Sequence, residues 1–239
     1  MYFHRSTLGP VDLAFTDRFG GVSGVPYGEL NLAFDGDDDA ASIRENHRLL
    51  MADFAPGDVL ADLHQVHGSA VVTAAADGFA ETPPADGVVT VEAGVALLVR
   101  AADCVPVLLA DPVAGIVGAA HSGRPGLVKG VVPATVRRMR ELGAEQLTAW
   151  IGPYVCGACY EVPEVMQSDV GDRIPEAVST TSWGTPALDI GAGVRAQLAA
   201  AGVEVVDLSV CTRESDALYS YRRDGAAAGR HAGLIRVRR

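Results

Sequence analysis

Short runs of β-branched and small apolar residues recur along this chain, and they constrain its fold more than any other feature. Runs of this length and composition, bounded by turn residues, predict strands. The apolar stretch from Val88 to Leu109 is interrupted by Glu92, Arg100 and Asp103, so it cannot be a membrane-spanning helix. We place strands at Val11–Thr16, Ala70–Thr73, Gly87–Val91, Val95–Ala101, Val105–Ala110, Ile116–Ala120, Thr148–Ile151 and Val203–Leu208.

Helical spacing and helix boundaries occur in a smaller number of segments. We expect helices at Ala40–Asp53, at Leu127–Leu142 before Gly143, at Gly191–Ala201 before Gly202, and near Glu164–Arg173. Several strands follow one another after Ala70 before a long helix occurs, so the order is not the strict alternation of a doubly wound parallel sheet. The sequence therefore predicts an α+β fold, with residues 1–239 forming a single domain of mixed β-sheets layered with helices.

The charge balance limits the classes of partner. The net charge of −11 would repel phosphate backbones, and no Lys/Arg-rich stripe offsets it locally, so we expect no nucleic-acid partner. Because no apolar run is long enough to span a bilayer, we also expect no membrane association. The first residues lack a basic segment followed by an apolar run, which favours the cytoplasm over secretion. Thiols stay reduced there, so the four cysteines are interpreted as core, metal-binding or catalytic residues rather than as disulfides.

Two histidines and one cysteine stand at the ends of predicted strands. His67 lies in Gln65-Val-His-Gly68 before a strand, His121 closes the run Gly-Ile-Val-Gly-Ala-Ala, and Cys104 follows Asp103 between two apolar strands. Catalytic zinc commonly uses three protein ligands of these types and a water molecule. The spacing is not that of a compact zinc finger, so roles in the core or in turns stay open. Asp103 needs a partner or a function, because burial of an unpaired carboxylate is costly.

The remaining histidines are assigned by position. His64 competes with His67, because residues three apart in a strand point to opposite faces and only one would face the site. We expect His4, His47 and His231 at the surface.

Three other motifs allow more than one interpretation. Cys156-Gly-Ala-Cys159 lacks a second Cys-x-x-Cys pair and a preceding thioredoxin-like aromatic residue, so structural cysteines are favoured over a redox pair or a metal site. The glycine turn after Arg18 is either an anion-binding loop or an ordinary turn. The arginines at Tyr219-Ser-Tyr-Arg-Arg-Asp-Gly225 and Gly229-Arg230 could bind phosphate or carboxylate, or form a solvated tail.

Taken in chain order, these segments resemble the YfiH-like family, also called the laccase-domain or polyphenol oxidoreductase family and regarded as purine nucleoside phosphorylases. The resemblance runs through nearly the whole chain. It rests on Arg18-Phe-Gly-Gly-Val-Ser23, Tyr27-Gly-Glu-Leu-Asn-Leu32, Gln65-Val-His-Gly68, Ala85-Asp86, Ala102-Asp-Cys-Val-Pro-Val-Leu108, Gly118-Ala-Ala-His121, Ile151-Gly-Pro153, Cys159-Tyr-Glu-Val162 and Tyr221-Arg-Arg-Asp-Gly225 with Gly229-Arg230.

The resemblance implies one zinc ion per chain, bound by His67, Cys104 and His121, in a mixed fold of layered sheets. It implies phosphate-dependent cleavage of adenosine, inosine, guanosine or methylthioadenosine, with adenosine deamination as a second activity. We accordingly expect contacts to the substrate from Arg18, Asn31, Asp86, Tyr160 and Arg223. The chain departs from the family at His121-Ser-Gly-Arg-Pro-Gly126, where His-Ala-Gly-Trp-Arg-Gly is usual, so its substrate preference is open.

The expected mechanism combines the metal with acid–base chemistry. Zinc would organise phosphate or water, Arg18 and Arg223 would bind anionic groups, and Asp103 or Asp86 would assist proton transfer to the purine. Asp103, Cys104 and His121 are therefore the expected catalytic residues. Asp103 and Cys104 are adjacent, so both can serve one site only if the strand ends or bulges there.

Other functions compete with this one. A multicopper oxidase is rejected, because a blue-copper site alone takes two histidines and a cysteine and too few histidines remain for a copper cluster. A metal-independent hydrolase would use Cys104 as nucleophile and His121 as base. A third possibility is a non-catalytic binding protein stabilised by zinc. The sequence predicts neither the preferred nucleoside, nor the protein partners, nor the oligomeric state.

Overall fold

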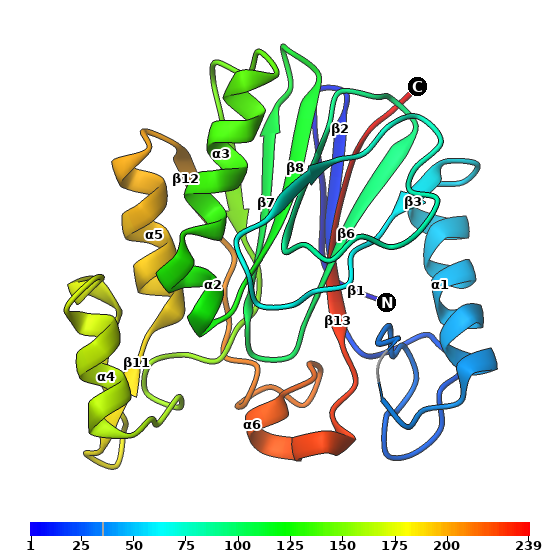
Figure 1. The fold of residues 1–239 in the computed structure, drawn as a ribbon. Coiled ribbons are helices and arrows are strands. Elements are labelled where there is room, and N and C mark those ends of the chain that lie inside the picture. The colour runs from blue at the N-terminus through cyan, green and yellow to red at the C-terminus, as the bar shows by residue number, and fades with distance from the viewer. Residues whose placement is uncertain (35) are drawn as a thin grey trace.

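Two β-sheets pack face to face in the computed structural model, and helices cover both outer faces (Figure 1). The structure describes residues 1–34 and 36–239. The first sheet has the order β1 (Tyr2–Leu8), β2 (Val11–Thr16), β13 (His231–Val237), β6 (Val95–Ala101) and β3 (Val59–Ala61). The second has the order β12 (Glu204–Asp207), β9 (Thr148–Ile151), β7 (Val105–Asp111), β8 (Ile116–Ser122), β5 (Gly87–Thr90) and β4 (Val71–Thr73). Both sheets mix parallel and antiparallel pairs, which confirms the predicted fold class.

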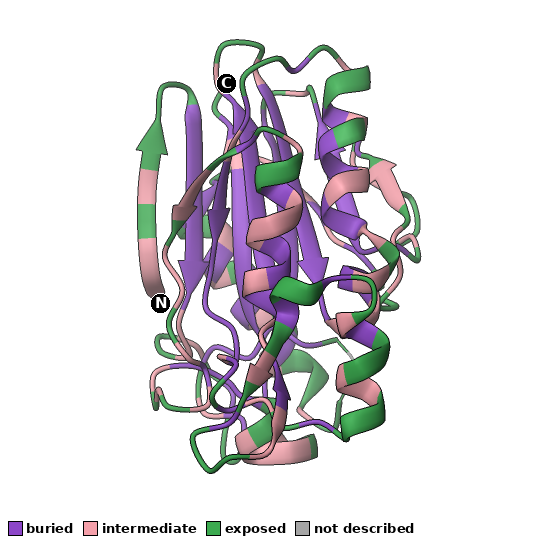
Figure 2. Cartoon of the chain, turned by 90° about the vertical axis from the view of Figure 1, so that its left-hand side faces the viewer, coloured by how far each residue is buried: buried purple, intermediate pink, exposed green. Residues whose placement is uncertain are grey.

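The central strands are apolar throughout because both of their faces are covered. In β6, Val95, Leu97 and Val99 belong to the core between the two sheets, whereas Ala96 and Leu98 pack towards helix α1 (Ala40–Phe54). Figure 2 shows the buried central strands between helices that are exposed on their outer faces. Residues of alternating direction thus all reach a core, and this gives the uninterrupted runs from which the strands were predicted.

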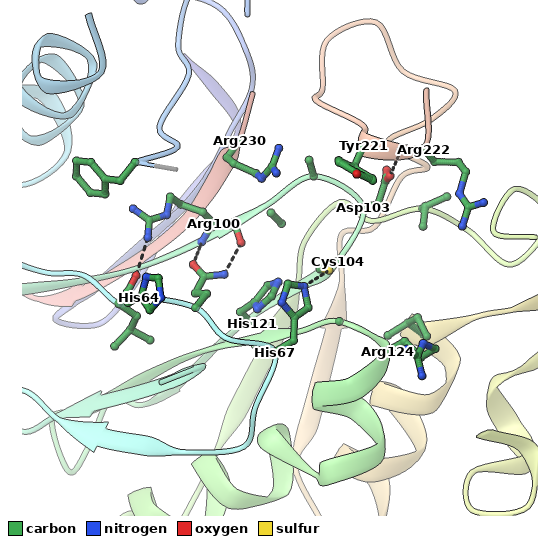
Figure 3. A pocket seen from close by; sticks show the side chains of 18 of the residues that line it. His64, His67, Arg100, Asp103, Cys104, His121, Arg124, Tyr221, Arg222 and Arg230 are labelled. Atoms are coloured by element: carbon green, nitrogen blue, oxygen red, sulfur yellow. Dashed lines mark hydrogen bonds between the residues drawn. The ribbon is translucent and has the colours of Figure 1, made fainter. Parts of the chain in front are cut away.

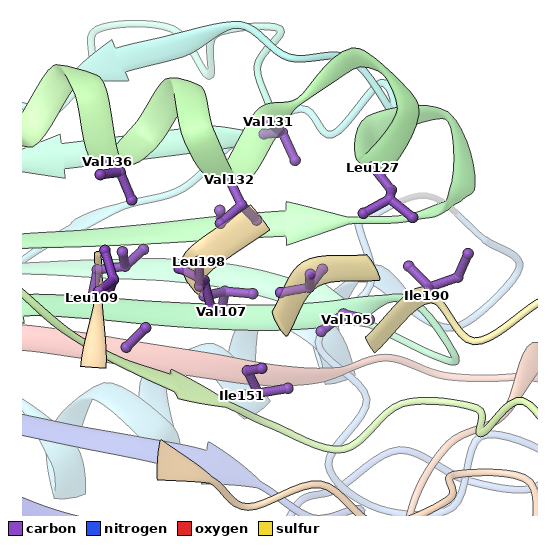
Figure 4. Close-up of a cluster of buried hydrophobic side chains, with 14 of the residues drawn as sticks. Val105, Val107, Leu109, Leu127, Val131, Val132, Val136, Ile151, Ile190 and Leu198 are labelled. Carbon is purple, nitrogen blue, oxygen red and sulfur yellow. The ribbon is translucent and has the colours of Figure 1, made fainter. Parts of the chain in front are cut away.

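Helices α2 (Arg124–Lys129), α3 (Val131–Glu141) and α5 (Ile190–Ala200) cover the outer face of the second sheet. Their apolar side chains meet those of β7 in one core, which includes Val107, Leu109, Val132, Val136 and Leu198 (Figure 4). The remaining elements are the hairpin β10 (Val178–Thr180) and β11 (Pro186–Leu188), helices α4 (Glu164–Gly171) and α6 (Tyr221–Asp224), and the 3-10 turns Pro175–Ala177 and Gly225–Ala227. None of the helices in the described ranges is long and apolar enough to cross a membrane.

Two kinds of element differ from the prediction. The single helix expected at Leu127–Leu142 is wrong: Gly130 takes a left-handed conformation with φ 77° and separates α2 from α3. Strands β1, β3 and β13 and the β10–β11 hairpin were not predicted. The first of these is a half-exposed edge strand, β3 has three residues, and β13 carries a histidine and an arginine among its apolar residues.

Candidate metal centre and its pocket

A cavity of about 1040 Å³ opens where β6 and β8 end and β7 begins (Figure 3). Its walls come from the loop after β3, the turn between β6 and β7, the start of α2, and α6. The turn from β6 to β7 passes from one sheet to the other, so the cavity lies at one end of the sandwich and both sheets contribute to it. A cavity of this size is large enough for a nucleoside and an anion.

His67, Cys104 and His121 meet in this cavity, as predicted. Their ligand atoms all lie within 4.8 Å of one another, and Cys104 Sγ is 3.7 Å from His67 Nε2. The strand register explains the meeting, because His121 pairs with Pro106 across β7 and β8, and Cys104 immediately precedes β7. Zinc bonds of about 2.1 Å to nitrogen and 2.3 Å to sulfur give a tetrahedral N–S edge of about 3.6 Å, so the three residues fit this ion.

Asp86 holds two of the three residues in place. Its carboxylate accepts hydrogen bonds from the amides of Val66, His67 and Gly68 at 3.2, 3.0 and 2.6 Å, and from His121 Nδ1 at 2.8 Å. With its proton on Nδ1, the His121 ring leaves Nε2 free to bind a metal. Asp86 has no exposed surface and does not line the cavity; it lies behind the histidines.

Cys104 and His121 shift each other's pKa in opposite directions. Burial alone would raise the pKa of Cys104, but His121 and then His67 outweigh it and lower the pKa to about 6. Burial would lower the pKa of His121, but the Cys104 thiolate and Asp86 outweigh it and raise the pKa to about 9. The sulfur is therefore ready as a thiolate, which is the form that binds zinc or acts as a nucleophile.

Two backbone features allow the three side chains to approach. His67 has φ 56° and Asp103 has φ 89°, conformations that are unusual for residues with a side chain. A Cβ atom on Gly123 would lie 2.6 Å from His67 Cδ2 and 2.8 Å from Cys104 Sγ. Only glycine fits at this position, although the sequence analysis did not single it out.

Asp103 also reaches the cavity, because β6 ends before it. Its two carboxylate oxygens accept hydrogen bonds from Thr212 Oγ1 at 2.6 Å and from the Arg222 amide at 2.5 Å. The strand end that the sequence analysis required for Asp103 and Cys104 to share one site is therefore present.

Four arginines line the cavity, and two of them, Arg222 and Arg230, belong to the C-terminal group that the sequence analysis considered for phosphate or carboxylate binding. Arg100 is engaged by Asp62 at 2.7 Å and by the Leu63 carbonyl at 2.6 Å. Arg124 and Arg222 have no carboxylate within 4 Å among residues 1–34 and 36–239, and Arg222 stacks on the Tyr160 ring at 4.9 Å. Figure 3 shows these two arginines on one side of the metal-binding residues, with Arg100 and His64 on the other and Arg230 above.

The expected substrate contacts are only partly brought together. Tyr160 lines the cavity. Arg18 stacks on Tyr219, and Asn31 is buried against Asp38 and the Arg230 amide. Arg223 donates to the carbonyls of the 212–218 segment and to Asp224. None of these three lines the cavity.

Three histidine assignments change. His64 and His67 both line the cavity, because their segment is a loop rather than a strand, although only His67 joins the cluster. His47 and His231 are buried, at 7% and 0% exposed, so their assignment to the surface is wrong. His47 lies on the buried face of helix α1 with its ring stacked on that of Phe34, and His231 begins the central strand β13.

Comparison with known proteins identifies the family to which this sequence is similar. Residues 12–238 match the family described as multi-copper polyphenol oxidoreductase laccase. A purine nucleoside phosphorylase of Streptomyces coelicolor is 51% identical over 241 residues, covering 98% of this chain and 99% of the relative. One of Corynebacterium glutamicum is 41% identical over 234 residues, covering 95% and 94%.

Solved structures of similar proteins have the same fold over nearly the whole chain. A Neisseria meningitidis protein of the DUF152 family has a TM-score of 0.88 at 32% identity and covers both chains completely. YlmD from Geobacillus stearothermophilus has a TM-score of 0.86 at 30% identity and covers 96% of this chain and 93% of its own. The chain therefore belongs to the multi-copper polyphenol oxidoreductase laccase family, which includes the YfiH-like proteins.

Proposed function

We propose that this protein is a zinc-dependent purine nucleoside phosphorylase with adenosine deaminase activity. The observation that carries the proposal is the cluster of His67, Cys104 and His121 at the wall of an arginine-lined cavity. The names of the relatives support the phosphorylase activity. The substrates proposed are adenosine, inosine, guanosine and methylthioadenosine, together with phosphate.

The arginines beside Tyr160 are suited to bind phosphate, the nucleophile of the proposed reaction. In phosphorolysis, a phosphate oxygen bonds to C1′ of the ribose while the bond from C1′ to the purine nitrogen breaks and its electrons pass to the purine. We assign the phosphate to Arg124 and Arg222, since both line the cavity without a carboxylate partner among the described residues. The amide of Arg222 is fixed by Asp103, which positions this side of the cavity.

His67, Cys104 and His121 would hold the zinc ion, and Asp86 keeps the proton of His121 on Nδ1. When bound, zinc would polarise a water molecule or an anionic oxygen. Of the two acids considered for proton transfer, we assign Asp103, because it lines the cavity whereas Asp86 is enclosed by four donors. Deamination would use the same residues with water in place of phosphate and would release ammonia. The four cysteines are free, which supports the cytoplasm as the location.

The test is a chromatographic assay of the zinc-loaded protein with the four nucleosides, with and without phosphate. We expect release of the free base that depends on phosphate, and conversion of adenosine to inosine without it. His121→Ala should be folded but inactive and should lose this zinc, whereas His4→Ala, which lies on β1 away from the cavity, should keep both. No turnover of any nucleoside would contradict the proposal.

The same preparations separate the competing functions. If a thiol alkylator abolishes activity while a chelator leaves it intact, Cys104 acts as a hydrolase nucleophile without metal. If His121→Ala unfolds as it loses zinc, the metal is structural, as in a binding protein.

A further inference from the structure

A second group of metal-binding side chains lies outside the cavity. The Sγ atoms of Cys156, Cys159 and Cys211 and a carboxylate oxygen of Glu214 all lie within 4.8 Å of one another. Cys156 and Cys159 are the pair that the sequence analysis favoured as merely structural, because no second Cys-x-x-Cys pair exists. The second half is instead Cys211-Thr-Arg-Glu214, which has the same spacing but ends in a carboxylate.

Both halves are tight turns, and the backbone joins them. The amides of Cys159 and Tyr160 bond to the Cys156 carbonyl at 3.0 Å, and the Glu214 amide bonds to the Cys211 carbonyl at 3.3 Å. A parallel bridge connects Tyr154 with Cys211. Ligands three residues apart in two such turns are the usual arrangement of structural zinc sites.

The side chains converge between the two turns. The Cys156 amide donates to Cys211 Sγ at 3.5 Å, and Cys159 Sγ lies 3.4 Å from Glu214 Oε1. A tetrahedral zinc ion with sulfur ligands at about 2.3 Å has S–S edges of about 3.8 Å, so four donors grouped this closely need little movement to enclose the ion. A hydrogen bond from the Cys156 amide to a ligand sulfur would also stabilise the thiolate.

We propose that Cys156, Cys159, Cys211 and Glu214 form a second, structural zinc site. A disulfide would use two sulfurs and leave a thiol and a carboxylate side by side, whereas a zinc ion uses all four donors. The donor set is closed, in contrast to the three-residue centre in the cavity, and three thiolates favour zinc over magnesium or calcium.

The second site fixes one wall of the cavity. Cys159 is followed by Tyr160, which lines the cavity, and Cys211 is followed by Thr212, which donates to Asp103 beside Cys104. Asp103 in turn holds the amide of Arg222. A zinc ion would therefore link the segments that carry Tyr160 and Arg222 without taking part in the reaction.

Metal content measured by mass spectrometry tests the proposal and does not depend on catalysis. After loading with zinc alone and gel filtration, the wild type should contain two zinc ions per chain. Cys159→Ser and His121→Ala should each contain one, and the double variant none. A Cys159→Ser protein that keeps the wild-type zinc content would overturn the proposal, whereas loss of zinc from His121→Ala concerns only the cavity site.

Glu214→Gln covers the case in which Cys159→Ser does not fold, because Glu214 is exposed. We expect a chelator to remove the second zinc at a concentration at least about tenfold lower than for the wild type. Asp216→Asn, which removes an exposed carboxylate of the same loop outside the cluster, should behave as the wild type. Equal resistance of both variants would contradict the site.

Cobalt and thiol titration complete the test. Cobalt-loaded His121→Ala should show thiolate-to-metal charge-transfer absorption that Cys159→Ser/His121→Ala lacks. Four thiols should react in denaturant with chelator and without reductant; two would indicate a disulfide in place of the metal.

Discussion

At the scale of single residues, the function of a buried carboxylate depends on which groups it holds. Asp86 and Asp111 are both almost fully buried, and each accepts four hydrogen bonds. All four donors to Asp111 are backbone amides in the turn after β7 and in the segment before β9. One donor to Asp86 is His121, and another is the amide of His67. Of these two carboxylates, only Asp86 therefore contacts residues of the His67, Cys104 and His121 cluster.

Asp86→Asn should weaken zinc binding at the cavity about 10- to 100-fold, since the amide group cannot accept from all four donors and the charge that orients His121 is lost. Competition of the folded variant with a chelator measures this affinity. Asp111→Asn is the matched control: it should lose about 1–3 kcal/mol in unfolding free energy and keep the wild-type affinity for zinc at the cavity. Wild-type affinity in Asp86→Asn would show that His121 does not need this partner.

His67, Cys104 and His121 could be singled out from the sequence because each stands in a recognisable motif, in the loop before β4, in the turn between β6 and β7, and near the end of β8 respectively. The sequence could not show which individual arginines line the cavity, because the chain has one lysine, Lys129, and 18 arginines, so no single arginine is distinctive. Arg222 faces the cavity, whereas its neighbour Arg223 binds backbone carbonyls, and this depends on the short helix α6. Glu214 lies 55 residues from Cys159, so no local pattern links it to the cysteine pair.

At the scale of elements, the long apolar strands β6, β7 and β8 were predicted, because both of their faces are covered. The strands that were missed are half-exposed (β1), only three residues long (β3), or interrupted by a histidine and an arginine (β13). The helices were predicted less accurately at their ends than in their interiors. The helical spacing of apolar residues continues from Leu127 to Leu142 without a break at Gly130. In the structure, however, this glycine is both the C-cap of α2 and the N-cap of α3. The break turns the chain so that α2 packs beside β8 next to the metal centre, whereas α3 continues along the sheet.

Gly130→Ala should destabilise the protein by about 1–2 kcal/mol, because a side chain disfavours the left-handed conformation at φ 77°. Steric clash contributes little, since the nearest atom to an added Cβ is Pro133 Cγ at 3.9 Å. Urea denaturation at constant zinc concentration measures the change. Gly24→Ala, at an exposed position without positive φ and with open space around it, should change the free energy of unfolding by less than about 0.5 kcal/mol. Equal effects of the two variants would contradict the role of Gly130.

At the scale of the whole molecule, the layers bury groups that ordinarily face water. Four layers, helix–sheet–sheet–helix, leave the central strands without solvent on either side (Figure 2). His47 on α1 and His231 on β13 were expected at the surface, but whether a polar residue is buried depends on which layers cover its element. The sequence pattern predicts where helices and strands lie, but it does not predict which layers pack over each of them.

These two histidines should make the whole fold sensitive to acid. Burial lowers the pKa of His47 and of His231 to about 4 each, although the hydrogen bond of His47 to the Leu32 carbonyl partly opposes the shift of that residue. The unfolded chain, with histidine pKa values near 6.5, therefore binds more protons than the folded chain between pH 6.5 and 4. Their stabilising contribution is fully present above pH 6.5 and is lost as the pH falls through this window.

At pH 5 each histidine should thus cost about 2 kcal/mol of unfolding free energy relative to its value at pH 7. Guanidinium denaturation at the two pH values measures the fall. His231→Gln removes the titrating group and keeps a polar side chain of similar size, so its fall should be about 2 kcal/mol smaller than that of the wild type. His47→Gln should act likewise, and the double variant should show about twice the effect. Any acid release of the proposed zinc ion from the cavity should be the same in all four proteins and should cancel in these differences. If the single variants lose as much stability between pH 7 and 5 as the wild type, the two rings do not stay neutral inside the folded protein.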